Sequence, residues 1–243
     1  MNFRNTSIAL VASAGLLGGV GMANAADMSR PVYKAPMVAP AFSWTGLYVG
    51  AVAGYAWGEA DIAHNGILGL AGLSTMRTKP DGWLAGGTVG YNYQQGNLVL
   101  GTEGEFYWSN LDGSATTSLP LGGGTFVGTY SNNWTGTLST RLGVAFDTIL
   151  VYSKAGVAWA NNDYTLGIVA PAASVSMSET ETGWLVGGGV EWAFARNWSA
   201  KIEGTYMNFG SKSREFPTPV VPAPVSIDAN VSTVKFGVNY RFY

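Results

Sequence analysis

Nine charged side chains lie in segments that are otherwise apolar or small, and they are the residues with which this chain could do chemistry. They comprise four acids and five bases: Glu103, Glu105, Arg141, Lys154, Glu191, Lys201, Glu203, Lys235 and Arg241. An isolated charge in apolar surroundings is very unfavourable, so such groups pair with one another unless they line a wet conduit. The choice between these two roles depends on the elements that carry the charges.

The chain offers little else for catalysis or ligand binding. His64 is the single histidine and there is no cysteine, whereas a metal site or a Ser-His dyad needs several converging groups. The glycine clusters 86–87 and 122–124 lack the lysine and following helix of a phosphate loop. We therefore expect no cofactor and no enzymatic activity, with catalysis through His64 as the weaker alternative.

The charged segments alternate large apolar residues with small or polar ones, which is the period of a β-strand. In WLVGGGVEWAF (184–194), Trp184, Val190 and Trp192 share one face while Glu191 lies on the other. The same alternation predicts eight strands: 44–57, 82–93, 98–108, 133–146, 149–159, 184–194, 198–208 and 232–243.

The connections between these predicted strands alternate in length. Tight turns are expected at 94–97, 147–148 and 195–197, and links of more than 20 residues at 58–81, 109–132, 160–181 and 209–231. Glu181 falls in the third of these links, which we expect to be an external loop. Short turns at one end and long loops at the other are typical of outer-membrane barrels. We predict an all-β fold, an eight-stranded antiparallel transmembrane β-barrel with four long external loops and short periplasmic turns.

Tryptophans mark both ends of the predicted strands. Trp57, Trp83, Trp108, Trp134, Trp159 and Trp184 recur every 25 or 26 residues at the long-loop end, and Trp44, Trp192 and Trp198 lie near the short-turn end. Tryptophan is enriched where membrane meets water, because its ring is apolar and its N–H is polar. These nine residues are therefore predicted to form two aromatic girdles.

The nine charges all lie on the face opposite the large apolar residues. A lysine or arginine facing lipid near the midplane would cost about 2–4 kcal/mol, which explains the segregation. In an eight-stranded barrel that opposite face is an interior just wide enough for side chains. We expect an interior network of ion pairs, with glycines making room for long side chains and no wide pore; the alternative is that the charges line a functional conduit.

The N-terminus precedes the predicted barrel. Arg4, an apolar run and the A-x-A site at 23–25 predict a signal peptide at 1–25. Prolines 31, 36 and 40 predict an extended periplasmic linker at 26–43, followed by the barrel at 44–243. Export together with the predicted barrel leads us to expect the protein in the cell outer membrane. The net charge of −2, with no Lys/Arg cluster, gives no case for binding nucleic acid.

Two long motifs carry a family resemblance. PAFSWTGLYVGAVAGYAWG (40–58) and GGTVGYNYQQGNLVLGTEGEF (86–106), together with the terminal VNYRF (238–242), resemble the small outer-membrane β-barrel surface proteins of alphaproteobacteria. That family is related in architecture to the OmpA transmembrane barrel. The likeness spans nearly all of the chain after the predicted signal peptide, with one departure, since Tyr243 follows the lipid-phase aromatic Phe242.

The resemblance implies a role in envelope integrity and in host or surface interaction through the external loops. Some members bind haem and others are called porins, so a narrow porin or a haem-binding uptake protein is the alternative function. No haem-ligand motif carries over to this chain. The expected partners are outer-membrane lipids and lipopolysaccharide, the barrel assembly machinery, and host or surface ligands of the loops.

Overall fold

The computed structural model describes residues 42–64, 75–118, 125–168, 173–216 and 223–242. All the elements in these ranges are strands: β1 (Gly46–His64), β2 (Thr75–Thr78), β3 (Asp81–Gln95), β4 (Leu98–Ser118), β5 (Thr125–Phe146), β6 (Ile149–Ile168), β7 (Ala173–Ala193), β8 (Trp198–Phe216) and β9 (Ala223–Phe242). Within the described part of the chain, no helix is long and apolar enough to cross a membrane. The predicted signal peptide and the linker up to residue 41 lie outside the described residues.

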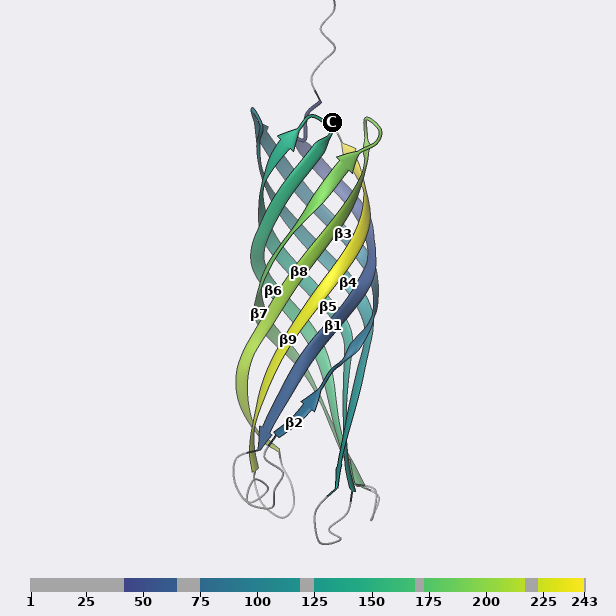
Figure 1. The fold of residues 1–243 in the computed structure, drawn as a ribbon, viewed down its shortest axis with the longest axis vertical. Coiled ribbons are helices and arrows are strands. Elements are labelled where there is room, and N and C mark those ends of the chain that lie inside the picture. The colour runs from purple at the N-terminus through teal and green to yellow at the C-terminus, as the bar shows by residue number, and fades with distance from the viewer. Residues whose placement is uncertain (1–41, 65–74, 119–124, 169–172, 217–222, 243) are drawn as a thin grey trace, which may run out of the picture. The chain divides into compact units, whose positions relative to one another are not determined.

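The eight long strands form one closed antiparallel barrel (Figure 1). Each strand pairs with the next, and β1 closes the sheet by pairing with β9 from Leu47↔Phe242 to His64↔Val225. The short β2 pairs with the outer end of β1. The eight-stranded antiparallel barrel predicted from the sequence is confirmed.

Three tight turns join strands at the periplasmic end. Gly96 and Asp147, in the β3–β4 and β5–β6 turns, have positive φ angles of 61° and 54°. A left-handed backbone suits these two-residue turns because it matches the twist of the paired strands. These turns hold neighbouring strands in register where their charged residues begin.

The strands are longer than the sequence pattern predicted. In their described parts, the links expected at 58–81, 109–132, 160–181 and 209–231 are almost entirely strand, since β4 runs to Ser118 and β7 begins at Ala173. Beyond the membrane the outward side chains meet water, so hydroxyl residues such as Thr165 and Ser176 replace the apolar ones. The backbone ladder continues although the hydrophobic alternation stops. That is why alternation alone ended the strands too early.

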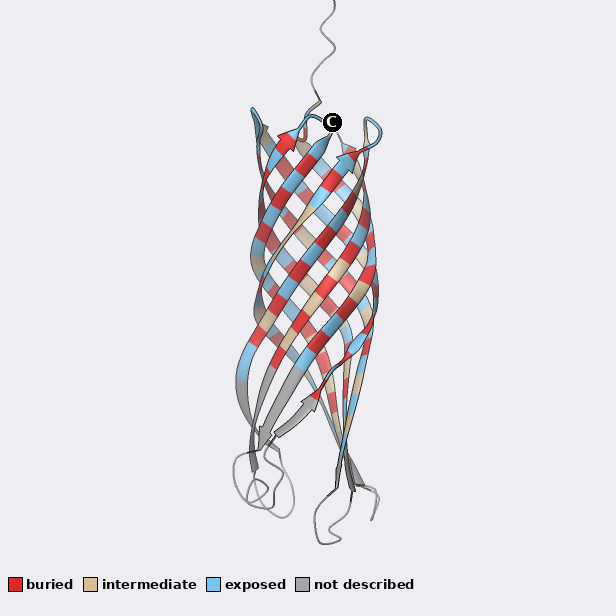
Figure 2. Ribbon diagram, viewed as in Figure 1, coloured by how far each residue is buried: buried red, intermediate tan, exposed pale blue. Residues whose placement is uncertain are grey.

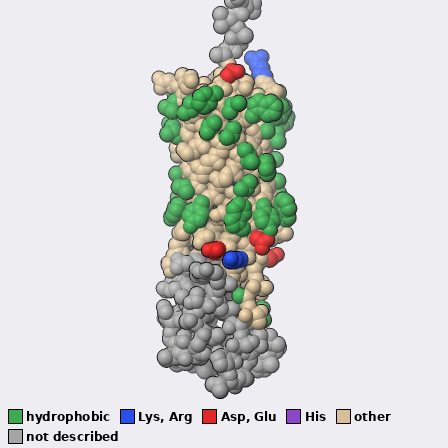
Figure 3. All heavy atoms as spheres, viewed as in Figure 1, with side chains coloured by type: hydrophobic (Ala, Val, Ile, Leu, Met, Phe, Trp, Pro, Cys, Tyr) green, Lys and Arg blue, Asp and Glu red, His purple; other side chains and the backbone are tan. Residues whose placement is uncertain are grey.

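The barrel wall has inverted polarity relative to a soluble protein. Exposed and buried residues alternate along the strands (Figure 2), and large apolar side chains are exposed on the outer surface, where on the face drawn in Figure 3 they gather towards both ends of the described part. Along β7, Trp184 and Trp192 are 51% and 55% exposed while Glu191 between them is 1% exposed. Their spacing fits the 9–11 tilted residues that a strand needs to cross a bilayer.

Most of the predicted girdle residues lie on this outer surface. Seven are exposed: Trp57, Trp83, Trp108, Trp159, Trp184, Trp192 and Trp198. Trp134 is half-buried, and its ring stacks on that of Phe106 at 5.7 Å. Trp44 is the exception. It is fully buried inside the barrel, so its assignment to a girdle was wrong.

Candidate functional site: the barrel interior

The charged residues face inward because of their position in the strand period. Glu103 and Glu105 are two residues apart in β4, as are Lys201 and Glu203 in β8, so each pair shares a face. The register between neighbouring strands then places Glu191 opposite Lys201 and Glu203 opposite Lys235. All four acids are at most 4% exposed.

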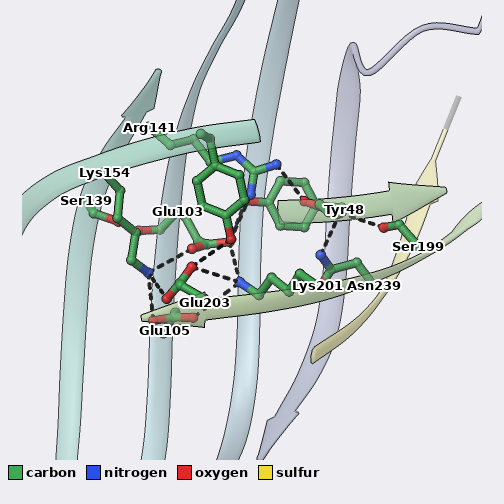
Figure 4. Close-up of polar contacts among 12 residues, drawn as sticks. Tyr48, Glu103, Glu105, Ser139, Arg141, Lys154, Ser199, Lys201, Glu203 and Asn239 are labelled. Atoms are coloured by element: carbon green, nitrogen blue, oxygen red, sulfur yellow. Dashed lines mark hydrogen bonds and ion pairs between the residues drawn. The ribbon is translucent and has the colours of Figure 1, made fainter. Parts of the chain in front are cut away.

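Three glutamates and three lysines form the centre of the network, and Figure 4 labels Glu103, Glu105, Glu203, Lys154 and Lys201 among them. The ammonium of Lys154 lies 3.1 Å from Glu103, 3.0 Å from Glu105 and 2.6 Å from Glu203. Lys201 lies 2.8 Å from Glu103 and 3.3 Å from Glu105. Lys235 pairs with Glu105 and lies 3.0 Å from Glu203.

Arg141 connects this centre to Glu191. Its guanidinium lies 3.3 Å from Glu103 and 2.9 Å from Glu191. The ring centroids of Tyr48 and Tyr152 lie 5.1 and 4.6 Å from its Cζ, which is within cation–π range. The eight charges are therefore one continuous network that crosses the lumen.

Neutral side chains satisfy the remaining carboxylate oxygens. The Tyr48 hydroxyl donates to Glu103 at 2.8 Å, and the Tyr152 hydroxyl donates to Glu203 at 2.8 Å. Ser199 and Asn239 both donate to Oε1 of Glu191. Sequence reasoning missed these four residues, although each lies in the inward phase of its strand, and that phase was the signal that could have identified them.

Glycines make room for the inward side chains. A Cβ on Gly90 would collide with the Tyr48 ring, and a Cβ on Gly237 would come within 3.0 Å of the Lys201 stem. In WLVGGGVEWAF, a Cβ on Gly189 would reach the Tyr152 hydroxyl at 2.9 Å. Absence of Cβ atoms at these positions lets the tyrosine and lysine side chains cross the lumen.

Arg241, the ninth predicted member of the network, lies at the periplasmic end instead. Its guanidinium lies 4.4 and 4.6 Å from the ring centroids of Phe42 and Trp44. It also donates to the backbone carbonyls of Ser43 and Arg196. The structure thus brings eight of the nine predicted residues together and assigns the ninth to a separate contact.

Trp44 closes the lumen at this end. Its indole N–H donates to the Asp147 carbonyl at 3.0 Å, and its backbone N–H donates to Gln94 at 2.7 Å. Its ring belongs to an apolar cluster with Val99, Ala145, Leu150, Tyr152 and Ala193. Side chains alternate between the two faces of a strand, and Trp44 lies an odd number of positions before Leu47 and Trp57. The alternation of the first strand therefore already put Trp44 on the inward face, opposite to Leu47 and Trp57.

An apolar layer fills the lumen on the outer side of the charges. Its buried members include Leu84, Tyr107, Leu185, Met207 and Phe209. Leu84, Tyr107, Met207 and Phe209 border a small cavity of about 10 Å³, which is room for about one water molecule. The charged network is therefore enclosed between two apolar layers.

A polar layer lies on the extracellular side of this outer apolar layer, inside the part of the barrel that extends beyond the membrane. Asn162 accepts hydrogen bonds from Tyr130 and Asn132 and donates to Glu181 at 2.9 Å. Tyr164 donates to Glu181 at 3.2 Å. Glu181 is 3% exposed, so its placement in an external loop was wrong. The reason is the extra length of β7, whose inward phase continues past Trp184.

Two titratable groups in this outer part have shifted pKa values. Hydrogen bonds from Ser178 and Asn133 hold the pKa of the Asp163 carboxyl below its ordinary value. Burial raises the pKa of the Tyr130 hydroxyl well above its ordinary value. Tyr130 therefore stays a neutral hydrogen-bond donor to Asn162.

The central carboxylates do not form a convincing metal site. Oxygens of Glu103, Glu105 and Glu203 lie within 4.8 Å of one another, a spacing that a cation could bridge. Three lysine ammoniums already contact these oxygens and neutralise them. The donor set is that of an ion-pair network.

His64 is the last residue of β1 and lies opposite Val225 of β9, not in a loop as predicted. The placement of its side chain lies outside the described residues.

A lipid-facing apolar wall, aromatic residues at both ends and an ion-paired interior define an integral β-barrel protein of a membrane. Residues 12–242 match the family described as the outer membrane protein beta-barrel domain. The chain belongs to this family and is an outer-membrane protein, which confirms the family resemblance and the predicted location.

Known relatives agree with this assignment. The chain is 31% identical to a 31 kDa outer-membrane immunogenic protein of Brucella melitensis, across 97% of this chain and 99% of that protein. It is 29% identical to a 22 kDa outer membrane protein of Rhizobium leguminosarum, across 84% of this chain and 81% of that protein. These relatives are named as outer-membrane proteins, not as enzymes.

Among solved structures, the outer membrane protease OmpT from Escherichia coli has a TM-score of 0.54 to this chain at 9% identity. The match covers 84% of this chain and 99% of OmpT. At that identity the likeness concerns the barrel fold alone.

Proposed function

We propose that this protein is an occluded outer-membrane barrel that supports the integrity of the envelope and presents its extracellular part for interactions at the cell surface. The observation that carries the proposal is the network of four acids and four bases across the lumen, enclosed by apolar layers on both sides. Moving an ion through this interior would separate buried ion pairs, and each unpaired charge would be strongly unfavourable. This favours an occluded barrel over a narrow porin.

The extracellular part supports the surface role. Several strands continue well beyond the outer girdle, as β7 does from Trp184 to Ala173, and they expose small hydroxyl side chains such as Ser178 and Thr180. The relatives named immunogenic are consistent with surface exposure in this family. The partners we propose are the host or surface ligands of this part, lipopolysaccharide and lipids at the girdles, and the assembly machinery that inserts the barrel.

Conductance in planar bilayers tests the occluded lumen. The full-length protein is compared with an open porin under the same conditions, and we expect no stable opening of porin size. The control variant Glu59→Gln changes an exposed acid outside the network and should show the same conductance as the wild type. Stable porin-size conductance by the wild type would overturn the proposal.

Two further measurements test haem uptake and catalysis. A spectral titration with haem is expected to show no saturable change; a saturable change would support an uptake role. His64→Ala is expected to leave every envelope phenotype unaltered, because the proposal assigns no catalysis to the protein.

A further inference from the structure

The periplasmic rim of the barrel repeats one backbone contact. Each tight turn accepts a hydrogen bond, at one of its carbonyls, from the end of the strand that follows its hairpin. The three N–H···O=C contacts, at 2.7 to 2.8 Å, are Ala145 to Asn97, Ala193 to Thr148 and Arg241 to Asn197. They hold β5, β7 and β9 each against the turn of the preceding hairpin.

The corner between β1 and β9 has no such turn. These two strands are not consecutive in the chain, and their pairing ends at Leu47↔Phe242. Every other neighbouring pair of long strands is consecutive among the long strands, so a chain connection restrains its separation. We call the contact between β1 and β9 the seam. It is the place where the closed sheet separates most freely.

The interior ion pairs do not hold this seam. Their eight charged residues lie on β4 to β9, and β1 contributes only the hydroxyl of Tyr48, which donates to Glu103 of β4. The network therefore ties six strands to one another and leaves β1 attached to β9 by its ladder. Another contact has to restrain the seam at the rim.

Residues 42–45 occupy this corner as a segment that is not strand. Gly46, at the start of β1, has a φ of 141°, and a Cβ there would lie 2.6 Å from the Phe242 carbonyl oxygen. Glycine alone accepts this conformation and this close approach. The chain thereby enters the lumen from the wall, with Trp44 fully buried.

The segment is fixed to two of the neighbouring turns. The backbone N–H of Trp44 donates to Oε1 of Gln94 at 2.7 Å, and the backbone N–H of Gln94 donates to Oγ1 of Thr45 at 2.9 Å. The Trp44 indole donates to the Asp147 carbonyl at 3.0 Å. Side chains thus make at this corner the kind of contact that the backbone makes at the other three.

Arg241 connects the segment to the last strand. Its guanidinium lies 4.4 Å from the Phe42 ring and 4.6 Å from the Trp44 ring, and these two rings meet edge to face at 5.3 Å. It also donates to the carbonyls of Ser43 at 3.5 Å and Arg196 at 3.3 Å. Arg241 is 2% exposed, and cation–π contacts are strongest where water is excluded.

We propose that residues 42–45 and Arg241 form a seam latch, a conformational device that limits the rate at which the barrel opens between β1 and β9. The ladder of the seam cannot fray from the rim until the two rings release the guanidinium. This inference goes beyond the occluded lumen, because it concerns how the wall stays closed and not what crosses it.

The first test is the unfolding rate of the full-length protein in lipid vesicles containing urea, followed as loss of protection against an added protease. Arg241→Met keeps a long side chain and removes the guanidinium, with its two ring contacts and two hydrogen bonds. It is expected to unfold about tenfold faster than the wild type, because the latch breaks before the seam opens. Lys79→Met makes the same change at an exposed residue outside the latch, and should unfold at the wild-type rate.

A milder variant covers the case in which Arg241→Met does not fold. Phe42→Ala removes one of the two rings and leaves the guanidinium in place. It is expected to unfold about threefold faster than the wild type. The comparison below applies to either variant.

Disulfides then separate latching from general stabilisation. The chain has no cysteine, so cysteine pairs introduced at Ala51/Val238 across the seam, or at Val144/Val151 across β5 and β6, are unique. Directly opposite residues of an antiparallel pair are close enough for a disulfide, which forms under an added oxidant. The seam disulfide should reduce the effect of the latch variant to less than twofold, whereas the β5–β6 disulfide should leave it unchanged.

Reduction of the seam disulfide should restore the faster unfolding of the latch variant. Wild-type unfolding rates in both Arg241→Met and Phe42→Ala would overturn the latch. Equal acceleration with the two disulfides would overturn it as well, because the contacts would then stabilise the barrel without acting at the seam.

Discussion

Replacing Glu103 by glutamine removes one charge from the centre of the interior network. The carboxylate lies 3.3 Å from Arg141, 3.1 Å from Lys154 and 2.8 Å from Lys201. The four acids and four bases of the network cancel formally, so the substitution leaves one buried positive charge uncompensated. Removing one partner of a buried pair costs about 3–5 kcal/mol. Glutamine keeps the volume and some hydrogen bonds, so we expect the lower end of that range.

The assay is urea unfolding of the full-length barrel in lipid vesicles, followed by tryptophan fluorescence. A loss of about 3 kcal/mol lowers the urea midpoint by about 1 M or more at typical denaturant slopes. Glu59→Gln, which makes the same chemical change at an exposed residue of β1, should stay within about 0.5 kcal/mol of wild type. The double variant Glu103→Gln/Lys201→Met restores neutrality, and should cost less than the sum of its two single variants.

Two results would refute this reasoning. One is a Glu103→Gln effect as small as that of Glu59→Gln, which would mean that the network contributes little. The other is strict additivity in the double variant, which would mean that charge balance is not what stabilises the interior.

The remaining predictions concern packing inside the barrel. Trp44→Ala should lower the free energy of unfolding by about 3–5 kcal/mol, because it leaves a cavity at the periplasmic end of the lumen. Trp192→Ala removes a lipid-facing side chain and should lower the free energy of unfolding by less in the same urea experiment. Equal losses in the two variants would contradict the burial of Trp44. Gly90→Ala forces a methyl group against Tyr48 and should cost about 1–3 kcal/mol. Gly104→Ala is its control, since the nearest atom to an added Cβ is 3.8 Å away; thermal unfolding of the two variants should differ, and matching midpoints would be evidence against close interior packing.

The structure also corrects a comparison that the sequence suggests. If Glu181 lay in a loop, Glu181→Leu would affect stability less than Glu191→Leu and would serve as its control. Both carboxylates are buried and hydrogen-bonded, by Asn162 and Arg141 respectively. Glu59 is therefore the appropriate exposed control.

The sequence by itself determined the class of fold, the two faces of each strand and most members of the interior network. These properties are local, because a period of two assigns each side chain to lipid or lumen without knowledge of the neighbouring strand. The inward position of Glu191 in WLVGGGVEWAF follows from that phase alone. The same phase, followed strictly, would also have placed Trp44 inside.

Only the tertiary structure decided which charges meet and where the strands end. Lys201 and Glu103 are 98 residues apart and touch because barrel closure and register bring β4 and β8 across one lumen. The extracellular continuation of β7, and with it the burial of Glu181, depends on backbone pairing with β6. Backbone hydrogen bonds between strands do not require apolar side chains. Where the outward side chains meet water instead of lipid, the strands therefore continue without a hydrophobic alternation that the sequence could show.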